Sequence, residues 1–243
     1  MIYGKGVLEI IPGLKILPGP ESVAVHHPDN GSRALREMGG SVFLQETVNA
    51  LLRTLAARDP YTGQHSTRVT EVSLAFARFL GLSADDLEAL RHATYLHDIG
   101  KIGISDTILR KPGRLTPEER EIIETHPLIG EKIVEPLGLR MEEKNIILHH
   151  HERWDGGGYP NGLAREEIPF LCRLVALVDC FDALTSDRPY RSRFPFPDAL
   201  AEIETQAGRQ FDPHLARKFL ELMTSPISKV VEQYHLPAAA VRK

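Results

Sequence analysis

The chain has 243 residues, which suffice for one large domain or for a domain with a short extension. Hydrophobic residues make up 42% of the sequence and charged residues 26%, so an ordinary soluble globular core is expected. The net charge of −4 argues against broad nonspecific binding to DNA or RNA, which requires a basic surface.

Cysteine usage and hydropathy indicate the compartment. Cys172 and Cys180 lie eight residues apart in an apolar run typical of a helix, which suits two buried thiols better than a disulfide. A reducing cytoplasm is therefore expected. No apolar stretch reaches the length of a membrane span. Residues 7–17 contain Glu9, Pro12-Gly13 and Lys15 and do not fit a signal peptide.

The first 40 residues read as an N-terminal extension. Two short apolar runs around Pro12-Gly13 suggest a small hairpin within residues 1–17. Residues 18–40 are rich in Pro, Gly, Ser and Asn, which is typical of a linker. Helical periodicity begins near Phe43. The apolar positions that follow the i, i+3, i+4, i+7 rule are Val48, Leu51, Leu52 and Leu55.

Turn and cap signals divide the rest of the chain into helices. The stretch Asp59-Pro60-Tyr61-Thr62-Gly63 predicts a turn that ends the first helix. Ser83, with Asp86 three residues later, predicts the start of a helix that runs into His97-Asp98. Thr116, followed by Pro117 and two glutamates, predicts another start.

The remaining pattern is also helical. Between Gly63 and Ser83, one helix is expected with Val69, Val72, Phe76 and Phe79 on one face. Further helices are expected at about 127–135, 141–151, 169–185, 195–207 and 213–223. Only residues 156–168 look irregular over any length. Because strands and helices do not alternate, the predicted fold class is all-α.

Histidines are the most informative residues. Six of the eleven lie in or at the start of predicted helices: His65, His97, His126, His149, His150 and His151. A lone His-Asp pair is more often a hydrogen-bonded core histidine, but a tract of three histidines favours metal binding. Imidazoles mixed with carboxylates suit Fe, Mn, Zn or Ni better than Ca or Mg. Asp98 has two oxygens and could bridge two metals, an arrangement that catalyses displacement at phosphorus.

Several motifs together resemble the signature of HD-GYP phosphodiesterases, from about Phe43 to about Leu222. The two most specific are His97-Asp98-Ile99-Gly100-Lys101 and His150-His151-Glu152-Arg153-Trp154-Asp155-Gly156-Gly157-Gly158-Tyr159-Pro160. The other matching blocks cover residues 59–66, 111–116, 178–185, 187–191 and 208–213. The resemblance implies an HD-type helical bundle over residues 41–222, with a dimetal site in its core. A C-terminal helix and tail would occupy residues 223–243.

The resemblance also implies the metal ligands. The first metal would be held by His65, His97, Asp98 and Asp179. Asp98 would bridge to a second metal held by His126, His150 and His151. Two divalent transition metals are expected, Fe or Mn in first place and Zn or Ni as alternatives. His149 is set aside because successive helical side chains diverge by about 100°.

Further residues are candidates for contact with the substrate. Lys101 lies one helical turn beyond His97 and is expected to stabilise charge on phosphate oxygens, the alternative being a surface lysine. Arg188 and Arg191 suit phosphate oxygens and guanine edges, the alternative being solvated loop cations. Tyr159 is expected to line the substrate entrance. In the family, the Gly158-Tyr159-Pro160 loop is also implicated in docking a GGDEF-type diguanylate cyclase.

The implied function is hydrolysis of cyclic di-GMP to linear pGpG by a metal-bridged hydroxide, with Asp98 and Lys101 as catalytic residues. Further cleavage to GMP and assembly as a homodimer remain open. Alternatives are hydrolysis of another nucleotide, such as 3′,3′-cyclic GMP-AMP or a dNTP, and a binding module without turnover. The complete ligand set favours an enzyme. Tyr61 stands where some HD-GYP proteins carry a glutamate associated with a third metal, so two metals are expected.

Overall fold

The computed structural model describes residues 30–187 and 192–225, with side chains from Leu44 onward except those of Pro60 and Tyr61. Its contacts divide the chain between Val42 and Phe43. The hairpin expected in residues 1–17 lies outside the described residues, as does the tail from residue 226. Helix α1 spans Asn30–Arg58. Residues 30–40 of the expected linker are therefore helical.

The described residues form helices and contain no β-strand, which confirms the all-α fold class. The longer helices after α1 are α2 Pro60–Phe79, α3 Ala84–Leu96, α6 His126–Val134, α7 Met141–His149, α8 Phe170–Thr185, α9 Phe196–Thr205 and α10 Pro213–Thr224. The short ones are η1 Ile99–Gly103, α4 Asp106–Leu109, α5 Pro117–Ile123, η2 Glu135–Leu137 and η3 Arg165–Glu167. In the part that the structure describes, no helix is long and apolar enough to cross a membrane.

The predicted turn at residues 59–63 is instead the first turn of α2. The amide of Gly63 donates to the Asp59 carbonyl (3.2 Å), and the Thr62 hydroxyl donates to the Asp59 carboxylate (2.6 Å). Proline is well suited to the first position of a helix because it has no N–H to leave unpaired and its φ is already helical. Only Asp59 separates α1 from α2, so the residues that suggested a turn are those that start a helix.

The predicted helix starts at Ser83 and Thr116 are confirmed. The Asp86 amide donates to the Ser83 hydroxyl (3.1 Å), and the Ser83 amide donates back to the Asp86 carboxylate (3.2 Å). Thr116 and Glu119 form the same reciprocal pair at the start of α5. Each pair satisfies donors that a helix start leaves without an intrahelical partner.

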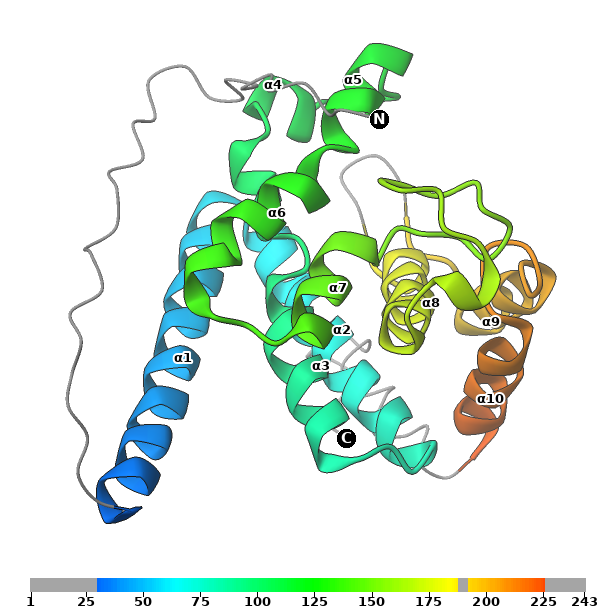
Figure 1. Cartoon of the computed structure of the whole chain (residues 1–243). Helices are drawn as coiled ribbons and strands as arrows, with labels where there is room; N and C mark the ends of the chain where they lie inside the picture. Colours follow the sequence, from blue (N-terminus) through cyan, green and yellow to red (C-terminus); the bar gives the residue numbers. More distant parts are fainter. Residues whose placement is uncertain (1–29, 188–191, 226–243) are drawn as a thin grey trace, which may run out of the picture. The chain divides into compact units, whose positions relative to one another are not determined.

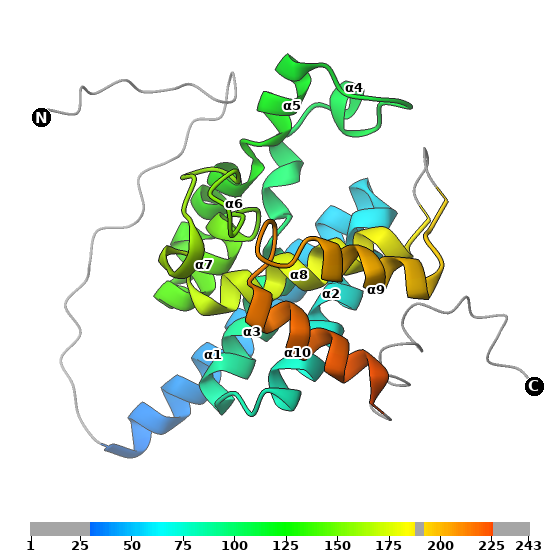
Figure 2. The ribbon, with the colours of Figure 1, turned by 90° about the vertical axis from the view of Figure 1, so that its right-hand side faces the viewer.

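The core lies among α2, α3, α7 and α8. Figure 1 shows α3 beside α7 and α2 beside α8, and both pairs are in contact. Figure 2 shows α8 with α9 and α10 next to it. Phe76, Phe181 and Phe219, from α2, α8 and α10, are fully buried and pack edge to face. This core holds the C-terminal ends of α3 and α7 near each other.

Cys172 and Cys180 both lie on α8 and form no disulfide, as predicted. Cys172 is fully buried and Cys180 half-buried. Burial raises the pKa of the Cys172 thiol, which therefore stays neutral and packs as an apolar group.

Candidate metal centre

Most of the predicted ligands lie at helix ends. His97 caps the C-terminus of α3 and Asp98 follows it. His126 begins α6, and His150 caps the C-terminus of α7. Only His65, in α2, and Asp179, in α8, lie inside helices. The site therefore forms where helix ends meet against the flanks of α2 and α8.

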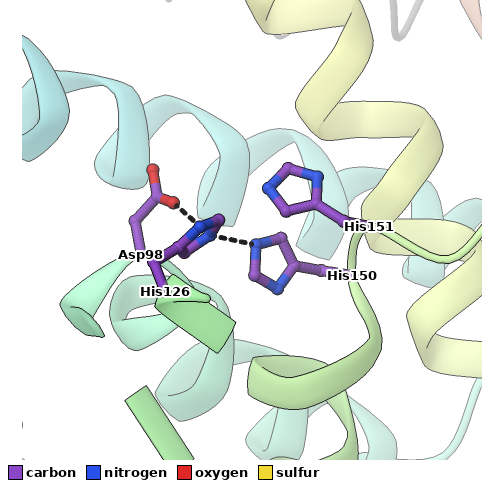
Figure 3. A group of neighbouring side chains, drawn as sticks. All are labelled: Asp98, His126, His150 and His151. Atoms are coloured by element: carbon purple, nitrogen blue, oxygen red, sulfur yellow. Dashed lines mark hydrogen bonds and ion pairs between the residues drawn. The ribbon is translucent and has the colours of Figure 1, made fainter. Parts of the chain in front are cut away.

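One group of ligand atoms comprises Asp98, His126, His150 and His151, all within 4.8 Å of one another. The Nε2 atom of His126 lies 3.3 Å from Asp98 Oδ1 and 3.3 Å from His150 Nε2. Figure 3 shows His126 between Asp98 and His150, with the ring of His151 beside that of His150. These four residues could hold one metal ion.

A second group comprises His65, His97 and Asp98, under the same distance limit. The Nε2 atoms of His65 and His97 lie 3.9 Å and 3.5 Å from Asp98 Oδ2. Asp179 joins this side, because its Oδ1 lies 2.9 Å from His65 Nε2. Asp98 belongs to both groups and offers a different oxygen to each. It is therefore placed as a bridging ligand would be.

The orientation of three imidazoles follows from the preceding helix turn. The Nδ1 atoms of His97, His126 and His150 donate to the carbonyls three residues earlier, at Thr94 (2.6 Å), Ile123 (2.7 Å) and Ile147 (3.0 Å). A helix leaves its last carbonyls without intrahelical partners, so these acceptors are available. A carbonyl can only accept, so Nδ1 carries the proton and the Nε2 lone pair faces the cluster.

The cluster fits a metal ion. Among the described residues, His97 Nε2 and Asp98 Oδ1 are buried without a hydrogen-bond partner. Buried polar atoms are nearly always paired, so an unpaired atom in each of the two ligand groups indicates that a partner is missing there. The donors are imidazole nitrogens and carboxylate oxygens, a set that suits a divalent transition metal.

The electrostatics of the cluster favour neutral imidazoles at His150 and His151 and an ionised carboxylate at Asp98. Burial, reinforced by neighbouring histidines, holds the pKa of His150 well below its ordinary value and lowers the pKa of His151 to about 3. Burial opposes ionisation of Asp98, yet Lys101 and His97 hold its pKa well below the ordinary value. Burial also disfavours the charged form of His65, but hydrogen bonds to Asp179 and Asp182 outweigh it and raise the pKa to about 9.

Asp182 supports His65 from behind, a role that the sequence did not reveal. Its fully buried carboxylate accepts from His65 Nδ1 (2.7 Å) and from Arg68 Nε (2.6 Å) and Nη2 (2.9 Å). Carboxylates that bind the remote nitrogen of a metal-ligating histidine fix the ring and strengthen its basicity. The available signal was the spacing of three residues from Asp179, which places both carboxylates on one side of α8.

Lys101 contacts the cluster but not in the predicted way. Its Nζ lies 2.6 Å from Asp98 Oδ2. However, α3 ends at Leu96 and Lys101 belongs to η1, so Lys101 does not lie one turn beyond His97 on the same helix. The backbone of η1 is held by Arg58 of α1, which donates to the carbonyls of Lys101 (3.0 Å) and Ile102. No pattern in the sequence predicted this contact.

Gly100 sets the distance between η1 and α6. A Cβ atom at this position would lie 1.9 Å from the carbonyl oxygen of His126 and 2.5 Å from the amide nitrogen of Gly130. Only glycine permits this approach. The contact brings Asp98 and His126 together although they come from different elements.

The loop after α7 borders the cluster. The Tyr159 ring lies 4.8 Å from the His151 ring, at an interplanar angle of 31°. His149 belongs to neither ligand group, and its Nδ1 lies 3.6 Å from Glu152 Oε1. Arg188 and Arg191, the predicted substrate contacts, lie outside the described residues.

Comparisons with known proteins identify the family. The family model described as "HD domain" matches residues 49–215. A cyclic di-GMP phosphodiesterase from Thermotoga maritima is 43% identical over 182 residues, which cover 74% of this chain and 50% of that protein. The 3′3′-cGAMP-specific phosphodiesterase 2 of Vibrio cholerae is 38% identical over 186 residues, covering 74% of this chain and 36% of that protein. The chain thus spans about half or less of the length of these relatives.

A solved structure supports the fold. The HD domain of the L. monocytogenes phosphodiesterase PgpH, in complex with cyclic-di-AMP, aligns with a TM-score of 0.56. The sequences are 18% identical, and the alignment covers 77% of this chain and 98% of that one. Together with the family match and with the HD-GYP motifs around His97-Asp98 and Tyr159-Pro160, these findings show that the chain belongs to the HD domain family.

Proposed function

We propose that this HD domain hydrolyses cyclic di-GMP to linear pGpG. The observation that carries the proposal is the pair of ligand groups that share Asp98, in a chain 43% identical to a cyclic di-GMP phosphodiesterase. Two metals about one carboxylate suit an in-line displacement at phosphorus. The ligands have the composition expected for Fe or Mn, with Zn or Ni as alternatives.

The candidate residues would have separate roles, as ligands of the two metals or as a contact to the phosphate. The first metal would be held by His65, His97, Asp98 and Asp179, and the second by Asp98, His126, His150 and His151. Bound there, the metals would activate the attacking water and polarise the phosphodiester. The Lys101 ammonium, at the edge of the cluster, would stabilise the negative charge that develops on the phosphate oxygens.

The substrate would be bound by residues around the cluster. Tyr159 would form one wall beside His151, where its half-buried ring lies. Arg188 and Arg191 would bind phosphate oxygens or guanine edges through paired N–H groups. The Gly158-Tyr159-Pro160 loop would also be the docking element for a GGDEF-type diguanylate cyclase, a role that rests on the family resemblance.

A second candidate substrate is 3′,3′-cyclic GMP-AMP, because relatives specific for it are 38% and 39% identical to this chain. The two dinucleotides differ in one base and share the phosphodiester ring. The metal cluster acts on the shared part, so the discrimination would lie in residues that contact the second base.

The experiment is turnover by the chain purified anaerobically and supplied with Mn²⁺ or Fe²⁺. Cyclic di-GMP, 3′,3′-cyclic GMP-AMP and a dNTP are compared by chromatography, and bound metal is measured on the same sample. Cyclic di-GMP should be cleaved fastest, with pGpG as the early product and two metals per chain. Faster turnover of the dNTP under all metals would refute the assignment, and three metals would refute the expectation based on Tyr61.

A further inference from the structure

The residue directly after the last histidine of the cluster, Glu152, is a buried carboxylate that serves a backbone loop. Its exposed fraction is 2%. The Oε1 atom accepts from the amide of Asn161 (2.8 Å), and Oε2 accepts from the amide of Leu163 (3.1 Å). A hydrogen bond to a charged acceptor is about twice as strong as one to a neutral acceptor. Burying the carboxylate without hydrogen-bond partners would cost free energy of folding. The two loop amides therefore supply the hydrogen bonds that the buried Glu152 carboxylate requires.

The backbone between these two amides is shaped for the carboxylate. Gly162 has a φ of +67°, in the left-handed region that glycine adopts without strain. A left-handed residue between two others turns successive amides toward one side and creates a concave anion-binding surface. The amides of Asn161 and Leu163 consequently converge on one side chain.

The first part of the loop, at Gly158 and Tyr159, packs against the segment that contains Glu152. The amide of Tyr159 donates to the carbonyl of His151 (3.3 Å). A Cβ atom on Gly158 would lie 2.5 to 2.6 Å from the backbone of residues 151–153. The loop thus folds back onto the chain just after the metal cluster, and Tyr159 lies at the first point of attachment, two residues before the second.

These contacts determine where the Tyr159 ring lies. Its centroid is 4.8 Å from that of His151 and 6.4 Å from that of His126, two residues of one ligand group. His151 and Glu152 are adjacent in sequence, so one short segment supplies both a ligand and the anchor of the aromatic wall.

We propose that Glu152 is a positioning residue that fixes Tyr159 beside the cluster and thereby strengthens binding of the cyclic dinucleotide without holding the metal. The inference rests on the proposed function for its substrate, but the attachment of the loop to Glu152 can be tested without any substrate.

The test is Glu152→Gln. The glutamine side chain keeps the size of glutamate. Its NH₂ group would face one of the two loop N–H groups, and because both groups are donors, that hydrogen bond would be lost. Hydrogen exchange should become faster in residues 156–163 and stay unchanged in α3 and α8. The KM for cyclic di-GMP should rise about tenfold, with a smaller change in kcat and no loss of metal.

A matched control lies just after the loop, in η3. Glu167 is exposed and its carboxylate accepts from the amide of Ala164 (3.0 Å). Glu167→Gln makes the same chemical change at a loop amide outside the segment that carries Tyr159. This variant should match the wild type in exchange over residues 156–163 and in KM.

A double-mutant cycle tests whether Glu152 acts through Tyr159. If it does, Glu152→Gln should add nothing to the KM of Tyr159→Ala. Additive effects, unchanged exchange in the loop, or loss of metal from Glu152→Gln would each overturn the proposal. If the wild-type chain cleaves no cyclic di-GMP, the proposed function fails, and the exchange experiment alone decides whether Glu152 holds the loop.

Discussion

The two sides of the candidate site are built in different ways. The ligand side consists mainly of helix ends, where three imidazoles are fixed by carbonyls one turn earlier. The distance between Asp98 and His126 depends on the contact of Gly100 with α6. The other side is the loop of residues 156–163, which has no regular structure and is held by Glu152 and by the carbonyl of His151. Metal binding and substrate binding should therefore respond to different mutations.

The largest effect should come from Asp98→Asn, which removes the charge shared by both ligand groups while keeping the size of the side chain. Metal should be lost from both groups, and turnover should fall at least about a thousandfold. Metal analysis and kinetics on one preparation check this. The control is Asp85→Asn, an exposed position on α3 that should retain both properties. Full metal content in Asp98→Asn would contradict the bridging role.

Lys101→Ala should lower kcat by about 10²–10³ and leave the metal in place, because its contribution grows with the charge that develops in the transition state. Metal content and kcat are the measurements. Lys132→Ala, on α6, serves as the control for loss of a lysine outside both ligand groups. If Lys101→Ala bound less metal, the lysine would belong to the ligand side as a partner of Asp98.

Asp182→Asn weakens the support behind His65 without touching the other ligand group. Loss of such a partner typically costs about 10–100-fold in metal affinity or activity. The bound metal should fall from two toward one per chain at limiting metal concentration, as measured by titration. Equal loss from both groups would show that Asp182 stabilises the whole fold instead.

The same chemical change at two glycines separates the two sides directly. Gly100→Ala should destabilise the fold by about 1–3 kcal/mol and reduce metal content, because its Cβ meets the backbone of α6. Gly158→Ala should displace the loop, raise KM and leave the metal bound. Gly103→Ala is the control, since its Cβ meets only the Ile129 side chain. Thermal melts, metal content and KM are measured for all three variants. The same phenotype for Gly100→Ala and Gly158→Ala would contradict a separation between the ligand side and the loop side.

The smallest effect is expected from a hydrogen bond between α3 and α7, the helices that carry His97 and His150 at their C-terminal ends. Glu143 of α7 accepts from His92 of α3 (2.8 Å) and from the amide of Arg140 (2.7 Å). Burial opposes ionisation of Glu143, but the effect of these hydrogen bonds is larger and lowers the pKa of its carboxyl group. Ionised Glu143 therefore stabilises the fold above its ordinary pKa of 4.5, and this contribution is lost as the pH falls through the lower value in the folded state.

Glu143→Gln should consequently cost about 1–2 kcal/mol at neutral pH, and the difference from the wild type should shrink in acid. Urea unfolding across this pH range measures both. Glu142→Gln, at the exposed neighbouring position, should show neither effect. A difference that stays constant down to acid would contradict an ionic role for Glu143.

Local signals explain what could be predicted from the sequence. Ser83 and Thr116 each carry the full cap pattern within four residues, and both helices start there. The residues 59–63 misled because Pro and Gly are common in turns, whereas Pro60 is here the first residue of a helix. Residues 30–40 combine glycine and serine, which are common in linkers, with good helix formers such as Ala34 and Leu35, and they are helical.

The candidate site divides in the same manner. The histidines and Asp98 were predictable because their residue types carry metal chemistry wherever they lie, and the motifs resemble a known family. Asp182, Arg58 and Glu152 were not, since each acts on a partner that only the folded chain brings near. Asp182 reaches back 117 residues to His65, and Arg58 reaches forward 43 residues to Lys101.

The bonds from Nδ1 to carbonyls three residues earlier also provide a rule for engineering. At His97, His126 and His150, four consecutive residues at a helix end contain all that is needed to aim one imidazole. A designer who wants a histidine site could graft such tetrapeptide ends onto any bundle and leave the scaffold to bring them together. His65 shows the more demanding solution, because a histidine in mid-helix needs a partner from another helix to be aimed at all.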